Sequence, residues 1–200
     1  MRLWLVRHAQ PLVEPGVCYG ATDIPADPQA TALAAAELAA TLPKGLLIQH
    51  SPLQRCEHLA QYLIALRPDL ALKSMPDLQE MDFGAWEGQR WDDIPAAELQ
   101  NWTYDFENYR CGSTGESTVQ FVARVQKVLQ SCLERDTHGI PDSPTVCITH
   151  AGVMRAALWL QQRGLATGQP LYLRAAEWPR HALGFGQVLM LDWLRPLQPG

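Results

Sequence analysis

The chain has 200 residues, of which 47% are hydrophobic and 18% charged, a balance typical of one globular domain and not of a disordered chain. Its formal net charge of −5 at pH 7 argues against general nucleic-acid binding, which needs a basic face, but allows an anionic substrate in a locally positive pocket. The five cysteines form no CxxC pair, and no apolar run suits a signal peptide or a membrane span, so we expect a cytoplasmic protein with free thiols and no membrane partner.

The first half of the chain alternates short apolar runs with helical patterns. Residues 3–6 predict a buried strand, and the Ala- and Leu-rich residues 30–41 predict a helix. Residues 46–48 predict a second strand, and residues 70–72 a further one. Between these two strands, apolar residues three and four positions apart mark one face of a helix: Leu53, Cys56, Ala60 and Leu63.

Residues 83–109 are rich in aromatic side chains, which are mixed with Asp, Glu and Asn. This stretch of 27 residues holds 7 of the 16 aromatic residues of the chain. It predicts either an irregular cap over one end of the sheet or a peripheral hydrophobic cluster under a long loop.

The second half of the chain contains two more helical patterns and two more strand candidates. Residues 113–116 have the spacing of a capping box, and they precede a helix predicted over 122–133. Residues 146–149 predict a strand that leads into a helix, and residues 187–193 are a candidate last strand.

This order of elements predicts an α/β fold. Strands that alternate with helices form a three-layer sandwich, with a mostly parallel central sheet and helices on both faces. We expect a single domain over residues 1–200, in which 83–115 form a small aromatic-rich cap insertion.

Two histidines and two arginines follow the three best-defined strands. Arg7 and His8 come directly after the first strand, Arg55 lies one turn into the helix after the second, and His150 comes directly after the third. Ligands bind beyond the carboxyl ends of strands in open α/β sheets, so these side chains meet if the three strands are neighbours. Guanidinium groups bind tetrahedral oxyanions, and a neutral imidazole is a competent nucleophile. The pattern predicts phosphoryl transfer through a histidine, with neither a metal nor a cofactor.

Three acidic residues are candidates for the proton donor to the leaving oxygen. Glu80 follows a short apolar stretch and has apolar neighbours, so partial burial and a bound phosphate dianion would favour its protonated form. Asp82 and Glu87 are close enough in the chain to be rivals.

Four short motifs contain these residues: Val6-Arg7-His8, Ser51-Pro52-Leu53-x-Arg55-Cys56, Leu78-x-Glu80-x-x-Phe83-Gly84-x-Trp86-Glu87-Gly88 and Thr149-His150-x-Gly152. In this order they resemble the histidine phosphatase superfamily, also called the phosphoglycerate mutase-like family. The resemblance implies that His8 accepts the phosphoryl group and that Glu80 donates the proton. It also implies that Arg7, Arg55 and His150 complete the phosphate pocket, and that His150 takes part in catalysis.

The chain departs from the family pattern in the loop after the first strand. Ala9 stands where the family usually has Gly, and Glu14 or Pro15 stands where an Asn often contacts phosphate. Ala9 is small and should be harmless, whereas the missing Asn contact bears on affinity and on substrate identity, not on the chemistry. Within the family, residues 18–25 and 115–117 resemble the α-ribazole phosphatases of cobalamin synthesis.

The function that these patterns favour is hydrolysis of a small organic phosphomonoester, with α-ribazole 5'-phosphate as one candidate substrate. A phosphoglycerate mutase-type phosphoryl transfer is the first alternative, and the short interval between Glu80 and His150 argues against it. A phosphate-binding regulatory module with little turnover is the second alternative, supported only by Ala9 and Glu14.

Overall fold

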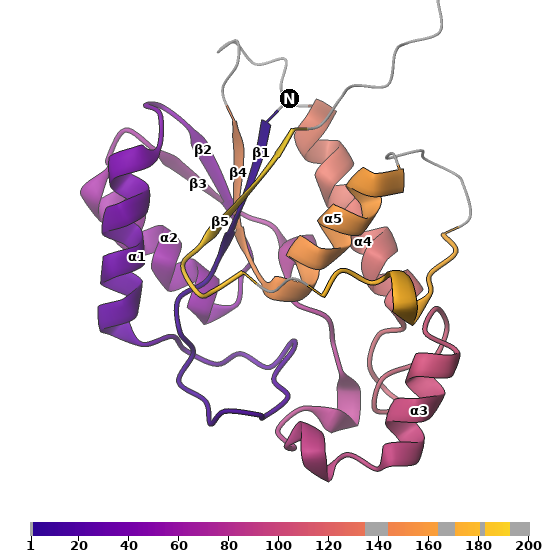
Figure 1. The fold of residues 1–200 in the computed structure, drawn as a ribbon. Coiled ribbons are helices and arrows are strands. Elements are labelled where there is room, and N and C mark those ends of the chain that lie inside the picture. Colours follow the sequence, from indigo (N-terminus) through magenta and orange to yellow (C-terminus); the bar gives the residue numbers. More distant parts are fainter. Residues whose placement is uncertain (1, 135–143, 164–170, 181–182, 193–200) are drawn as a thin grey trace, which may run out of the picture.

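The computed structural model of the chain describes residues 2–134, 144–163, 171–180 and 183–192. Within these residues, a five-stranded sheet runs through the middle of the molecule in the order β3-β2-β4-β1-β5 (Figure 1). Its strands are β1 (Arg2–Arg7), β2 (Leu47–His50), β3 (Ala71–Ser74), β4 (Thr145–Thr149) and β5 (Val188–Asp192). All neighbours pair in parallel except β1 and β5, which are antiparallel. The three best-defined predicted strands, β2, β4 and β1, are therefore immediate neighbours.

Helices cover both faces of the sheet. On one face lie α1 (Pro28–Thr41) and α2 (Gln54–Leu66), and on the other lie α4 (Thr118–Glu134) and α5 (Ala151–Arg163) (Figure 1). The predicted three-layer α/β sandwich is confirmed.

The neighbouring inner strands β1 and β4 supply apolar side chains to both faces of the sheet. Leu3 and Leu5 pack into the hydrophobic cluster formed with α4 and α5, whereas Val6, Val146 and Ile148 pack into the cluster formed with α1 and α2. Because both faces are covered, these strands need apolar residues at every position, and they read as continuous apolar runs in the sequence.

The capping box lies one turn later than predicted. The prediction placed it at 113–116, but α4 begins at residue 118. The reciprocal pair is Ser117 and Gln120: the Gln120 N–H donates to Ser117 Oγ at 3.4 Å, and the Ser117 N–H donates to Gln120 Oε1 at 3.0 Å. Glu116 forms an ion pair with Arg124 instead, with Oε2 and Nη2 2.7 Å apart.

Residues 83–115 lie beyond the carboxyl ends of the parallel strands, in the lower part of Figure 1. Their aromatic rings pack against one another, with ring centroids 5.3 Å apart for Phe83 and Trp91 and 5.6 Å apart for Trp86 and Trp102. Short helical segments complete the described elements: η1 (Pro76–Leu78), η2 (Gly84–Trp86), η3 (Trp91–Asp93), α3 (Ala96–Tyr104) and η5 (Ala175–Glu177).

Candidate active site

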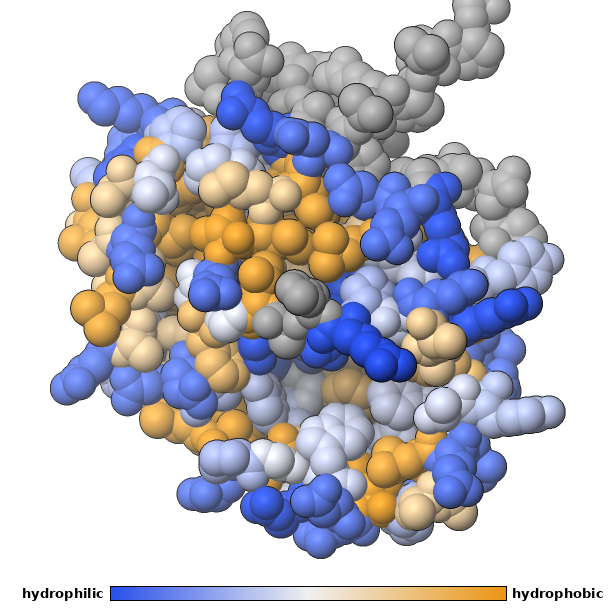
Figure 2. Space-filling view, in the orientation of Figure 1, coloured by the Kyte–Doolittle hydropathy of each residue, from blue (hydrophilic) through white to orange (hydrophobic). Residues whose placement is uncertain are grey.

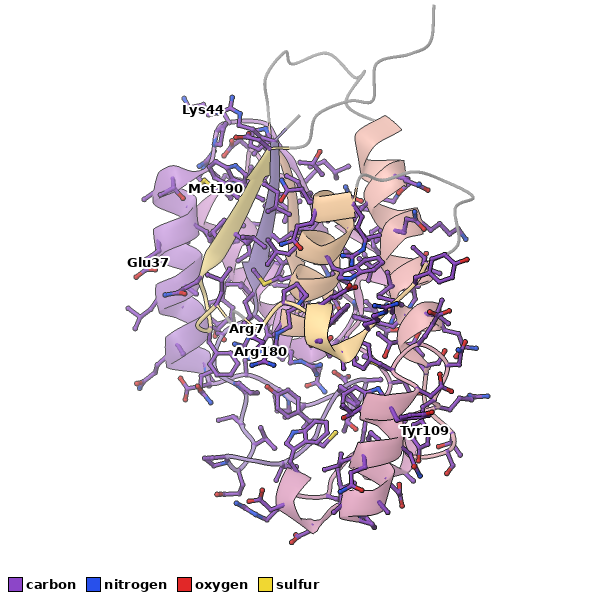
Figure 3. The ribbon with its side chains drawn as sticks, turned by 45° about the vertical axis from the view of Figure 1, so that its right-hand side comes forward. Arg7, Glu37, Lys44, Tyr109, Arg180 and Met190 are labelled. Carbon is purple, nitrogen blue, oxygen red and sulfur yellow. The ribbon has the colours of Figure 1, made fainter. Side chains whose placement is uncertain are left out.

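The carboxyl ends of β1, β2 and β4 bring the predicted phosphate-binding residues to one edge of the sheet. Arg7 is the last residue of β1 and His8 follows it, while His150 lies between the end of β4 and the start of α5. Arg55 reaches the same place from the first turn of α2. Figure 3 shows Arg7 at the lower end of the sheet, on the side of the part that contains α3.

His8 is held as a neutral imidazole with a defined tautomer. The side chain is only 2% exposed, and Nδ1 lies 2.7 Å from the carbonyl oxygen of Ala9. A carbonyl oxygen only accepts hydrogen bonds, so Nδ1 carries the proton and Nε2 keeps its lone pair. Burial, with smaller contributions from the charges of Arg55 and Arg7, lowers the pKa of His8 to about 3. At neutral pH His8 therefore presents a nucleophilic nitrogen without first losing a proton.

His150 lies directly beside His8, with ring centroids 5.1 Å apart, and it is fully buried. Arg55 Nε donates to His150 Nδ1 at 3.2 Å, so Nδ1 has no proton. The proton is then on Nε2, which donates to Ser51 Oγ at 2.8 Å. Burial, followed by the charges of Arg55 and the neighbouring His8, lowers the pKa of His150 well below the ordinary value of a histidine. The second imidazole is therefore also neutral, and its N–H is a hydrogen-bond donor beside His8.

Arg55 holds the loop after β1 against the site. Its side chain is fully buried, and Nη2 donates to the carbonyl oxygen of Gly20 at 2.6 Å while Nη1 donates to that of Thr22 at 2.8 Å. Together with the bond to His150, three of its five N–H groups are used inside the protein. Arg55 therefore positions the loop and His150, and its charge lies close behind His8.

A cavity of about 230 Å³ opens in front of His8. Figure 2 shows this side of the molecule hollowed between the part that carries the sheet and the part that carries α3. Of the predicted site residues, Arg7, His8 and Glu80 line the cavity, whereas Arg55 and His150 lie behind it. Its walls are largely aromatic: Tyr19, Phe83, Trp91, Trp102, Phe106, Phe121 and Trp178.

The side chain of Arg7 is held in place by the segment that precedes β5. Nη1 donates to the carbonyl oxygen of Leu183 at 2.6 Å, and the guanidinium carbon lies 3.9 Å from the centroid of the Phe185 ring. The buried Nε has no hydrogen-bond partner among the described residues. A bound oxyanion would supply the acceptor that this donor lacks.

Glu80 is placed in the cavity by backbone donors on both of its oxygens. Oε1 accepts from its neighbour Met81 N–H at 3.0 Å, and Oε2 accepts from Gly152 N–H, in the first turn of α5, at 2.9 Å. A Cβ atom at position 152 would collide with Oε1, so the helix can approach the carboxylate this closely only with glycine there.

The two rival acids do not line the cavity. Asp82 Oδ1 accepts from the Gly84 N–H at 2.8 Å and closes a turn. Glu87 accepts from the N–H groups of Ala21 and Thr22, at 2.8 and 2.6 Å. These bonds hold the loop after β1 against the segment that follows η2. The geometry therefore favours Glu80 as the acid that reaches a ligand.

The structure adds a cation that the sequence analysis did not select. Arg155 lines the cavity from α5, one turn beyond Ala151 and Gly152, which also line it. Side chains three and four positions apart share one face of a helix, so its distance from Gly152 was a signal available in the sequence. Glu14 and Pro15, by contrast, do not line the cavity, whereas Val17 and Tyr19 do.

Two further observations concern the described residues as a whole. Nowhere in them do three or more His, Cys, Asp or Glu side chains gather in a group that could hold a metal ion. None of the described helices combines the length and the apolar character needed to cross a membrane.

Comparisons with known proteins agree with this geometry. Residues 3–179 match the family model of the histidine phosphatase superfamily (branch 1). The adenosylcobalamin/alpha-ribazole phosphatase of Escherichia coli (strain K12) is 27% identical over 160 residues, which cover 77% of this chain and 75% of that protein.

Solved structures with the same fold include TTHB049 from Thermus thermophilus and a mycobacterial glucosyl-3-phosphoglycerate phosphatase in complex with VO3. The first has 28% sequence identity and a TM-score of 0.69, over 98% of this chain and 95% of that chain. The second has 26% identity and a TM-score of 0.75, over 96% and 90%. Because the family model spans most of the chain and the site geometry agrees with it, the chain is an enzyme of the histidine phosphatase superfamily, branch 1.

Proposed function

We propose that this enzyme hydrolyses a phosphomonoester of a small organic molecule and that His8 carries the phosphoryl group between the substrate and water. The observation that carries the proposal is the state of His8 in the cavity wall. The hydrogen bond from Nδ1 to Ala9 leaves Nε2 as the nitrogen with a lone pair, and Arg7 and Glu80 line the same cavity. A nucleophile, a cation and an acid thus share one space, as phosphoryl transfer requires.

In the proposed reaction, His8 Nε2 attacks phosphorus in line with the leaving oxygen. The P–N bond forms as the P–O bond breaks, and protonated Glu80 gives its proton to the leaving oxygen. Water then attacks phosphorus, Glu80 takes a proton from that water, and the P–N bond breaks to release inorganic phosphate and neutral His8. Arg7 balances the charge on the phosphoryl oxygens from within the cavity, and the charge of Arg55 supports it from behind His8. His150, whose N–H donates to Ser51 Oγ, packs its ring beside that of His8.

The aromatic walls support a leaving group with a planar ring. Trp91 and Trp102 are stacked, with ring centroids 6.5 Å apart and planes 13° apart, and both line the cavity. Aromatic surfaces of this kind favour a flat organic group over a small polar one. α-Ribazole 5'-phosphate has such a group, and the similar Escherichia coli protein is named for an α-ribazole phosphatase activity. We therefore propose it as the first substrate to test, with a role in cobalamin synthesis.

Replacing Glu80 with Gln tests the proton donor. We expect kcat for an alkyl phosphate to fall by about 10²- to 10⁴-fold, because the leaving alkoxide needs a proton. The fall should be much smaller for 4-nitrophenyl phosphate, whose leaving group departs as a stable anion. Steady-state rates of phosphate release on both substrates measure the difference, with Asp92→Asn at an exposed position as the matched control. An equal fall on both substrates would show that Glu80 does not donate the proton.

A further inference from the structure

Arg155 is the charged residue of the cavity that the proposed reaction does not use. It lines the cavity, and its buried Nε has no hydrogen-bond partner among the described residues. None of the ion pairs found between described residues includes it. An arginine N–H can only donate, and a buried donor without an acceptor is costly for the folded state. A ligand in the cavity would supply the missing acceptor.

The phosphate end of the cavity already has its own cations. Arg7 lines it, and Arg55 lies behind His8, so two guanidinium groups stand against the two negative charges of a phosphomonoester. His8 and His150 add no charge, because burial keeps both imidazoles neutral. Arg155 adds a further guanidinium group to a cavity whose phosphate end already has Arg7, with Arg55 behind His8.

Arg155 shares the cavity with side chains from other elements of the fold. Thr118 and Phe121 of α4 and Trp178, next to η5, line the cavity with it, and α4 packs against α5. These residues come from different elements than Arg7, the last residue of β1, and His8, which follows it. A planar leaving group held by the aromatic walls of this cavity has polar substituents that can accept hydrogen bonds from Arg155.

We propose that Arg155 determines specificity by donating hydrogen bonds to an oxygen acceptor on the leaving group, and not to the phosphate that is transferred. This assignment rests on the proposed phosphatase function and narrows its substrate class. The acceptor is either a carboxylate or the hydroxyl and ring oxygens of a sugar, because both accept hydrogen bonds from a guanidinium group.

Three phosphomonoesters separate these cases. Phenyl phosphate has no acceptor beyond the phosphate group, 4-carboxyphenyl phosphate adds a carboxylate, and α-ribazole 5'-phosphate adds the oxygens of a ribose. Arg155→Met keeps much of the length of the side chain and removes every donor. We expect kcat/KM of this variant on phenyl phosphate to stay within about threefold of wild type and to fall about 10- to 100-fold on at least one of the other two. The substrate that loses more identifies the acceptor, and Arg155→Lys should recover part of the loss.

The outcomes are distinct. An equal fall on all three substrates would place Arg155 on the transferred phosphate and overturn the assignment. Unchanged kcat/KM on both acceptor-bearing substrates, in a variant as active as wild type on phenyl phosphate, would overturn it too. Failure of the proposed function itself would appear differently, as wild-type protein that releases no phosphate from any of the three.

Discussion

Replacing His8 with Ala lowers kcat for 4-nitrophenyl phosphate by about 10⁴-fold or more, on the scale seen when a catalytic nucleophile is removed. The loss is this large because Nε2 of His8 forms the bond to phosphorus, and neighbouring His150 cannot replace it. The Nδ1 of His150 accepts from Arg55, and its Nε2 carries the proton, so neither nitrogen offers a free lone pair. Release of 4-nitrophenol over several hours measures the residual rate.

His58→Ala is the matched control, since it removes an imidazole from α2 that does not line the cavity. It should keep wild-type kcat, and thermal unfolding of the His8→Ala protein should show a cooperative transition. A folded His8→Ala protein with more than a tenth of wild-type activity would show that another residue is the nucleophile.

Replacing Arg55 with Met destabilises the fold and lowers activity together. We expect the free energy of unfolding to fall by about 3–5 kcal/mol, because the change leaves three buried or partly buried acceptors without their donor. These acceptors are the carbonyl oxygens of Gly20 and Thr22 and the Nδ1 of His150. Without Arg55, the site also loses the positive charge behind His8, so kcat of the folded fraction should fall by about 10²-fold, as for loss of one transition-state donor. Urea unfolding and the rate per folded molecule measure the two effects.

The chain contains a matched control for this experiment at the other end of α2. Arg67 donates to the carbonyl oxygens of Ala39, Leu42 and Pro43, at 2.8 to 2.9 Å, far from the cavity residues in the fold. Arg67→Met should lose stability as well, while its folded fraction keeps wild-type kcat. If the folded fraction of Arg55→Met were as active as wild type, Arg55 would have only a structural role.

The fold could be predicted because its main strands are buried on both faces. Runs such as 3–6 and 146–148 are apolar at every position, as expected for a central strand that helices cover on both faces. The antiparallel direction of β5 had no comparable signal in its residues. The capping box at Ser117 and Gln120 was missed because 113–116 have the same spacing. The structure distinguishes them, because α4 begins at residue 118 and Glu116 pairs with Arg124 instead.

The site residues at the strand ends could be predicted from the sequence. Which of them line the cavity and which lie behind it could not. Arg7 ends a strand, and His8 and His150 directly follow strands, so the topology alone brings them together. The side chain of Arg55 instead turns toward the carbonyl oxygens of a loop whose path depends on tertiary packing. No local pattern in the sequence predicts the path of this loop. Arg155 was missed for a related reason, because a single arginine on a helix is usually exposed.

The identity of the phosphorylated residue is the most direct test of this account. Wild-type enzyme is mixed with ³²P-labelled substrate, quenched in alkali within milliseconds and digested, and the labelled peptide is sequenced. We expect an acid-labile, alkali-stable phosphohistidine on His8, with phosphorus on Nε2 because Nδ1 is held by Ala9. Label on any other residue, or on Nδ1 of His8, would contradict it.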